Sequence, residues 1–176
     1  MKIRSITALG AALLFLQACS LVAQEARKSP HETVKATIDG ANISIEYGRP
    51  YMKGRKIEGG LIPYDSIWRA GADEATTLTS DKALVIGGTK VPAGKHTLYV
   101  AATAGDWQLA INNQTGQWGT DYDEKQDLAR VVLTKTAISA PVEQFTILIE
   151  PNASGGGVIK LRWNVTEASV PFSVAK

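Results

Sequence analysis

Short segments in which apolar and polar residues alternate recur along this chain and leave few folds open to it. The clearest of these segments are 42–47, 107–112, 144–150 and 158–166. Successive side chains of a β-strand point to opposite faces, so a period of two is typical of half-buried strands. Turn residues separate the segments at intervals of about ten residues, and the Asp39-Gly40 pair is a hairpin signal. We therefore predict an all-β fold, an antiparallel β-sandwich or jelly-roll-like barrel in a single domain.

Two later segments add detail to this predicted sheet. Residues 127–136 are interpreted as a strand, although Leu128 and residues 130–133 also fit a short helix. Residues 170–174 are predicted to form a short final strand. Pro171 stands near its start, and because proline cannot donate a ladder hydrogen bond, this placement favours the edge of a sheet.

The N-terminal segment is typical of a bacterial export signal. Lys2 and Arg4 precede an apolar run, residues 6–16, which is shorter than the ~20 residues of a membrane-spanning helix. The run leads to Cys19 with a small residue before it, a pattern similar to a lipobox. We predict a signal peptide over 1–18, lipidation at Cys19, a tether over 19–29 and a β-domain over 30–176. The alternative is ordinary cleavage after Ala23, with Cys19 discarded. Both alternatives export the protein to the periplasm, and a lipid anchor would hold it at a membrane, the outer membrane in a Gram-negative cell.

The charge of the chain excludes one class of partner. The chain has 19 basic and 17 acidic side chains, and the two numbers become equal once Lys2 and Arg4 are removed with the signal. A neutral domain lacks the positive surface that nucleic acids require, so no nucleic-acid partner is expected. Cys19 is the only cysteine. No intramolecular disulfide can form, and the domain depends on its hydrophobic core.

Residues 48–77, reading GRPYMKGRKIEGGLIPYDSIWRAGADEATT, form a long connection rich in cationic and aromatic side chains. Arginine offers a planar fork of donors that fits carboxylates and phosphates, and aromatic rings stack on ligands. With the loop 116–122, this stretch is the predicted binding face, and the candidate ligand-binding residues are Arg49, Tyr51, Arg55, Tyr64 and Trp118. The alternative is a structural brace in which Arg49 and Arg69 pair with Asp65, Asp73 or Glu74. Trp118 could likewise pin its own loop.

A resemblance to a known family rests on four stretches: GRPYMKGRKI, GGLIPYDSIWRAGADEATTLT, VPAGKHTLYV and NQTGQWGTDYDEKQDLARV. Together they resemble DUF2911, a family of bacterial secreted proteins and lipoproteins of unknown function. The resemblance covers roughly residue 29 to the C terminus. It implies an exported, β-rich single domain and supplies no established activity, cofactor or catalytic residue. The chain departs from the family pattern at Asp73, where Asn is common, and at His96, where an aromatic residue is common.

Other aromatic and acidic residues have simpler interpretations. Trp68 and Trp163 are predicted to lie in the core, and Trp107 to be half buried. An acidic cluster hints at a calcium site but does not follow the EF-hand pattern, and a solvated turn or the cap of a short helix explains it as well. Its members are Asp121, Asp123, Glu124 and Asp127. No metal and no cofactor are expected.

Three functions from different classes remain open. The first is a non-enzymatic module that binds a ligand or a protein at the bacterial cell envelope. The second is a hydrolase of envelope glycans or esters that uses Glu74 or Asp73 as acid or base, although neighbouring residues of a strand point to opposite faces. Two convergent carboxylates in a cleft would favour this second function. The third is a structural envelope module that acts through protein contacts and predicts a large exposed apolar patch without a pocket.

Overall fold

The computed structural model describes residues 29–176, so the predicted signal peptide and Cys19 lie outside the described residues. Within these residues the structure has ten β-strands and one short 3-10 helix. They are β1 (His31–Ile38), β2 (Ala41–Gly48), β3 (Ser66–Trp68), β4 (Thr77–Ser80), β5 (Leu84–Ile86), β6 (Thr89–Val91), β7 (Gly94–Ala102), β8 (Trp107–Asn112), η1 (Glu124–Gln126), β9 (Asp127–Pro151) and β10 (Gly157–Val174). No helix among residues 29–176 has the length and hydropathy needed to span a bilayer.

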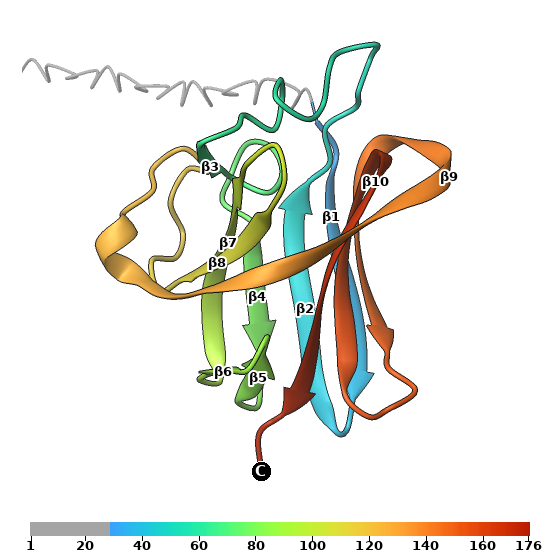
Figure 1. Cartoon of the computed structure of the whole chain (residues 1–176). Coiled ribbons are helices and arrows are strands. Elements are labelled where there is room, and N and C mark those ends of the chain that lie inside the picture. The colour runs from blue at the N-terminus through green and yellow to red at the C-terminus, as the bar shows by residue number, and fades with distance from the viewer. Residues whose placement is uncertain (1–28) are drawn as a thin grey trace, which may run out of the picture.

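All ten strands belong to one continuous antiparallel sheet (Figure 1). Its strand order is β1-β2-β4-β7-β8-β9-β10-β5-β6, and β3 pairs with β7 beside this path. The first part of β9 pairs with β8 and its last part pairs with β10. β9 therefore joins two halves of the sheet. The first half is made of β1, β2, β3, β4, β7 and β8, and the second half is made of β10, β5 and β6. The prediction of an all-β, antiparallel single domain is confirmed.

The predicted β1–β2 hairpin is present. Asp39 and Gly40 have φ values of 47° and 74°, as both central residues of a tight two-residue turn require. The turn puts Ile38 opposite Ala41 and His31 opposite Gly48. The alternation of β2 then directs Ile43, Ile45 and Tyr47 into the core.

The last two strands are longer than the sequence pattern indicates. Residues 127–136 and 144–150, predicted as separate segments, belong to the single 25-residue strand β9, so the short-helix alternative for 127–136 is wrong. β10 is also continuous, and its pairing with β9 shifts register on either side of Asn164. Such bulges bend a strand and increase its twist. The bend lets β9 run from one half of the sheet to the other, as Figure 1 shows in orange.

The predicted edge strand at 170–174 is not an edge. Residues 172–174 are the end of β10 and pair with β5, and the strand order ends at β1 and β6. Pro171 is accommodated because it lies between two ladders, after the pairing with β9 ends at Ser169 and before the pairing with β5 begins at Phe172. Its carbonyl still accepts a hydrogen bond from Gly87 N at 3.1 Å.

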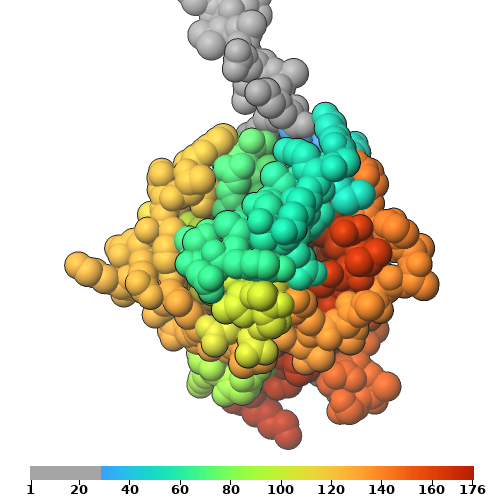
Figure 2. Space-filling view, turned by 45° about the horizontal axis from the view of Figure 1, so that its top comes forward, coloured from blue at the N-terminus to red at the C-terminus, as the bar shows by residue number. Residues whose placement is uncertain are grey.

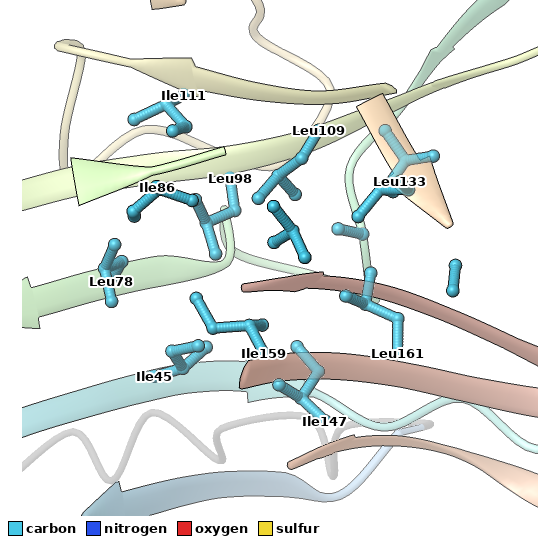
Figure 3. Packing of buried hydrophobic residues seen from close by; sticks show 14 of the residues in the cluster. Ile45, Leu78, Ile86, Leu98, Leu109, Ile111, Leu133, Ile147, Ile159 and Leu161 are labelled. Atoms are coloured by element: carbon cyan, nitrogen blue, oxygen red, sulfur yellow. The ribbon is translucent and has the colours of Figure 1, made fainter. Parts of the chain in front are cut away.

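The two halves of the sheet enclose one hydrophobic core. Figure 3 shows its aliphatic side chains meeting between strands of both halves, among them Ile45, Leu98, Leu109, Ile147, Ile159 and Leu161. One end of the core is aromatic: the ring of Trp68 lies 5.8 Å from that of Trp163, stacked at 21°, and 5.0 Å from that of Phe145. Trp68 and Trp163 are 7% and 3% exposed, which confirms both as core residues.

Trp107 is also buried, with 3% of its surface exposed, and the prediction that it is half buried is wrong. The prediction rested on the position of Trp107 at the start of β8, where one face of an indole ring is often exposed to solvent. The Nζ atom of Lys135, from the neighbouring strand β9, lies 4.8 Å from the centre of the ring. The side chain of Lys135 therefore covers the ring, and its charge gains a cation–π contact.

Candidate functional site

The connection between β2 and β4, residues 49–76 and hereafter the crossover, lies on the surface (teal in Figure 2). It begins by running beside β9 as a strand would. Met52 N donates to Glu143 O at 2.7 Å, and Phe145 N donates to Pro50 O at 2.9 Å. Later in the crossover, β3 pairs with β7. The crossover is therefore hydrogen-bonded to strands at both of its ends.

Arg49 is a brace for this arrangement. Its guanidinium forms an ion pair with Glu32 at 2.5 Å and donates to Phe145 O at 3.0 Å and to Thr146 Oγ1 at 2.8 Å. The three contacts join β1, the crossover and β9. Arg49 thus fulfils the structural alternative considered for it, although its acidic partner is Glu32 and the expected partners Asp65, Asp73 and Glu74 are not used.

A second brace is the carboxylate of Glu58, in the middle of the crossover. It accepts hydrogen bonds from Thr166 Oγ1, from Lys135 Nζ at 3.0 Å and from Tyr64 Oη at 3.5 Å. Burial raises the pKa of Glu58, but the hydrogen bonds from Thr166 and Lys135 outweigh it, and the pKa lies below the ordinary glutamate value of 4.5. Glu58 therefore fastens the crossover to β10 and β9 as an anion, and the Tyr64 hydroxyl is part of this contact.

The end of the crossover packs unusually close to β2. A Cβ atom on Gly48 would lie 2.2 Å from Ala72 O, so only glycine permits this approach of the two backbones. Thr76 Oγ1 donates to Ala70 O at 2.8 Å and closes the turn between them. Asp73 has φ of 64° within this turn, a conformation that Asp and Asn adopt more readily than other residues with a Cβ.

The loop before η1 joins the crossover here. Gly119 N donates to Asp73 O at 3.0 Å, and Ala75 N donates to Gln117 O at 3.2 Å. The two stretches of the predicted binding face, far apart in sequence, therefore lie side by side. Trp118 is 47% exposed on this loop, and its backbone forms a bridge with Glu74.

The acidic cluster that follows is occupied by protein contacts. Asp123 caps η1 by accepting from Lys125 N at 3.0 Å, which agrees with the cap interpretation. Asp127 accepts from Arg130 Nε at 2.9 Å and from Tyr122 Oη at 2.5 Å. Burial and the neighbouring Asp127 raise the pKa of Tyr122 to about 12. This network leaves Asp123 and Asp127 little capacity for a cation.

A pocket of 790 Å³ opens between the crossover, the loop and the start of the domain. Its charged lining residues are Lys53, Arg55, Arg69 and Asp73. Its remaining lining residues are Ser29, Pro50, Tyr51, Gly60, Leu61, Pro63, Ile67, Trp68, Gly71, Ala72, Gly119, Thr120 and Trp163. The pocket thus combines an excess of positive charge with an apolar and aromatic wall.

Arg69 differs from Arg55, the other arginine that lines this pocket. Within residues 29–176 its guanidinium makes no hydrogen bond or ion pair, whereas Arg55 donates to Tyr51 O at 2.6 Å and to Met52 O at 3.1 Å. The stem of Arg69 packs on Gly119, where a Cβ atom would lie 2.6 Å from Arg69 Cδ. The side chain of Arg69 is therefore held in place by packing, and its donors remain available.

A histidine and two carboxylates meet next to this pocket. His31 Nε2 lies 3.5 Å from Asp73 Oδ2 and 3.1 Å from Glu74 Oε2. The positive φ of Asp73 turns the backbone so that these neighbouring side chains converge, which they would not do in a regular strand. Asp73 lines the 790 Å³ pocket, whereas Glu74 and His31 line a separate pocket of 310 Å³.

The candidate ligand-binding residues are divided by this geometry. Tyr51 and Arg55 line the pocket, whereas Arg49, Tyr64 and Trp118 do not. Arg69, Lys53 and Trp163 line it without having been proposed as ligand-binding residues. The glycine at position 119 is the one sequence signal that could have indicated Arg69, because a glycine in a loop permits a close approach by another side chain.

Comparison with known proteins gives one match. Residues 29–172 match the family model described as a protein of unknown function, DUF2911. No curated protein and no solved structure is similar enough to count as a match.

Proposed function

Because this chain belongs to the DUF2911 family, whose function is unknown, we propose its role from the pocket itself: a non-enzymatic module that binds a ligand at the bacterial cell envelope. The observation that carries the proposal is the 790 Å³ pocket with the available guanidinium of Arg69 on its wall. Small-molecule sites are concave, mostly apolar and about 300–1,000 Å³ in volume, with a few convergent polar groups. The crossover pocket has each of these properties.

The two other functions receive less support from the same geometry. A hydrolase of glycans typically uses two carboxylates on either side of one scissile bond, but Asp73 and Glu74 line different pockets and share His31 as a contact. A structural module would present an extended apolar patch. The large apolar side chains exposed within residues 29–176 are Trp118, Val132 and Val165, which come from three separate segments.

The binding function is tested by the ligand that the protein retains. Thr120 is exposed at the rim of the pocket, so Thr120→Trp would fill the entrance without disturbing the core. Protein isolated from its native envelope is expected to release a bound molecule on denaturation, detected by mass spectrometry, and the variant is expected to lose it. The matched control is Thr136→Trp, an exposed position of β9 outside the pocket. A native protein that carries no molecule, or a Thr120→Trp variant that retains it, would contradict the proposal.

We further propose that the module is exported and held at the membrane by a lipid on Cys19, which lies outside the described residues. Two or more acyl chains anchor a protein durably, whereas one binds marginally. Cys19→Ala is therefore expected to move the protein from the membrane fraction to the soluble periplasm of a Gram-negative host, as measured by immunoblotting of fractions. The anchor is refuted if the unmodified protein is already fully soluble there.

A further inference from the structure

The ligand class follows from the contacts of the pocket, and this step rests on the proposed binding function. We propose that the pocket binds an amphiphilic oxyanion, a molecule with a carboxylate or phosphate group on an apolar body. The charged group pairs with the guanidinium of Arg69. The apolar body lies along the wall formed by Tyr51, Leu61, Pro63, Trp68 and Trp163.

The charge balance of the pocket favours an anion. Lys53, Arg55 and Arg69 line it with a single carboxylate, that of Asp73. The Oδ2 atom of Asp73 lies 3.5 Å from His31 Nε2, away from solvent. The carboxylate is therefore partly committed to a neighbour, and the side chains that line the pocket carry a net positive charge.

Among the arginines of residues 29–176, only Arg69 lacks a partner. Arg49 pairs with Glu32, and Arg130 pairs with Asp127. Arg162 pairs with Glu167, and Arg55 donates to two carbonyl oxygens of its own turn. A guanidinium held by packing against Gly119 and lacking an acceptor is suited to a bidentate contact with a carboxylate or phosphate.

The size and lining of the pocket indicate that the ligand has an apolar part. A pocket of 790 Å³ is in the range that accommodates a drug-sized molecule, and it is too large for a free phosphate or acetate ion to fill. Leu61, Pro63 and Ile67 contribute aliphatic surface, and the stacked rings of Trp68 and Trp163 add aromatic surface to the lining. Replacement of water at such a wall by an apolar group is favourable, because it removes apolar surface from water.

Two fluorescent probes that differ by one charged group test this class. The probes are 8-anilino-1-naphthalenesulfonate and its neutral parent N-phenyl-1-naphthylamine, titrated into the full chain carrying Cys19→Ala, so that no lipid competes. We expect the anion to bind more tightly than the parent. Arg69→Gln is expected to weaken binding of the anion roughly tenfold, the loss of a charged hydrogen bond, and to leave binding of the parent unchanged. Lys90→Gln, which removes an exposed cation far from the pocket in sequence, controls for net charge and should change neither.

Each other outcome has a definite meaning. If the neutral parent binds as tightly as the anion and Arg69→Gln affects neither, the ligand class is overturned while the binding function stands. If neither probe binds and the native protein carries no molecule, both are overturned. If Thr120→Trp does not block the probes, they bind elsewhere and the class is again overturned.

Competition distinguishes the sources of the oxyanion. Decanoate and decyl phosphate are expected to displace the anionic probe, with the better competitor identifying the headgroup, and decanol is expected to be at least tenfold weaker. If inorganic phosphate alone competes as well as decyl phosphate, the apolar body contributes nothing and the proposal of an amphiphile fails.

Discussion

Replacement of Trp68 by alanine is expected to lower the free energy of unfolding by about 3–5 kcal/mol, the range for removal of a buried tryptophan. Trp68 contacts both Trp163 and Phe145, so its removal leaves a cavity lined by two rings that cannot both move into it. It also lines the pocket, so the variant should lose the shape of the inner wall together with its stability.

Urea unfolding followed by circular dichroism measures this loss. Trp118→Ala is the matched control, because Trp118 is 47% exposed and lies outside the pocket. Its replacement should change stability by about 0.5 kcal/mol or less. Equal losses for the two variants would mean that the aromatic cluster at Trp68 does not hold this end of the core.

The second large effect is expected at Glu58. Glu58→Gln should lower the free energy of unfolding by about 1–3 kcal/mol at pH 7, because Lys135 then faces a neutral amide inside a partly buried contact. The pKa of Glu58 in the folded protein is below the ordinary glutamate value. As the pH falls, the Glu58 carboxylate is therefore protonated in the unfolded chain before it is protonated in the folded protein. The contribution of Glu58 is complete above about pH 5 and is lost as the pH falls through its folded pKa.

The stability difference between the native protein and Glu58→Gln should therefore narrow on acidification. Urea unfolding at pH 7 and at several values below 5 measures it. Glu150→Gln is the control, because Glu150 pairs with Lys160 at a more exposed position, where an ion pair contributes about 1 kcal/mol or less. A difference for Glu58→Gln that stays constant or widens at low pH would contradict the assigned role.

The class of fold was predictable because most strands face the core on one side only. β2 alternates buried and exposed side chains along its length, and Asp39-Gly40 requires the turn that it makes. The continuous strand β9 was not predictable in the same way. Its central residues 134–144 lie where the sheet bends, and none of them is buried. Without a buried face no period of two can appear, and Pro141 in this stretch further favours an interruption.

The binding face was predictable as a region, while the roles of its individual arginines were not. Composition marks the crossover as rich in charge and rings, but whether an arginine is used structurally depends on acidic partners supplied by other strands. Arg49 is occupied because β1 brings Glu32 to it. Arg69 remains available because Gly119, fifty positions later, makes room for its stem without offering an acceptor.

The attachment of the crossover at both ends has a consequence for ligand affinity. A segment of this length would ordinarily behave as a lid that becomes ordered when a molecule arrives. Here its start bonds to β9, its end bonds to β7 through β3, and Glu58 fastens its middle. The conformational entropy of this wall is thus lost once, during folding of the domain, and a ligand meets a preorganised cavity.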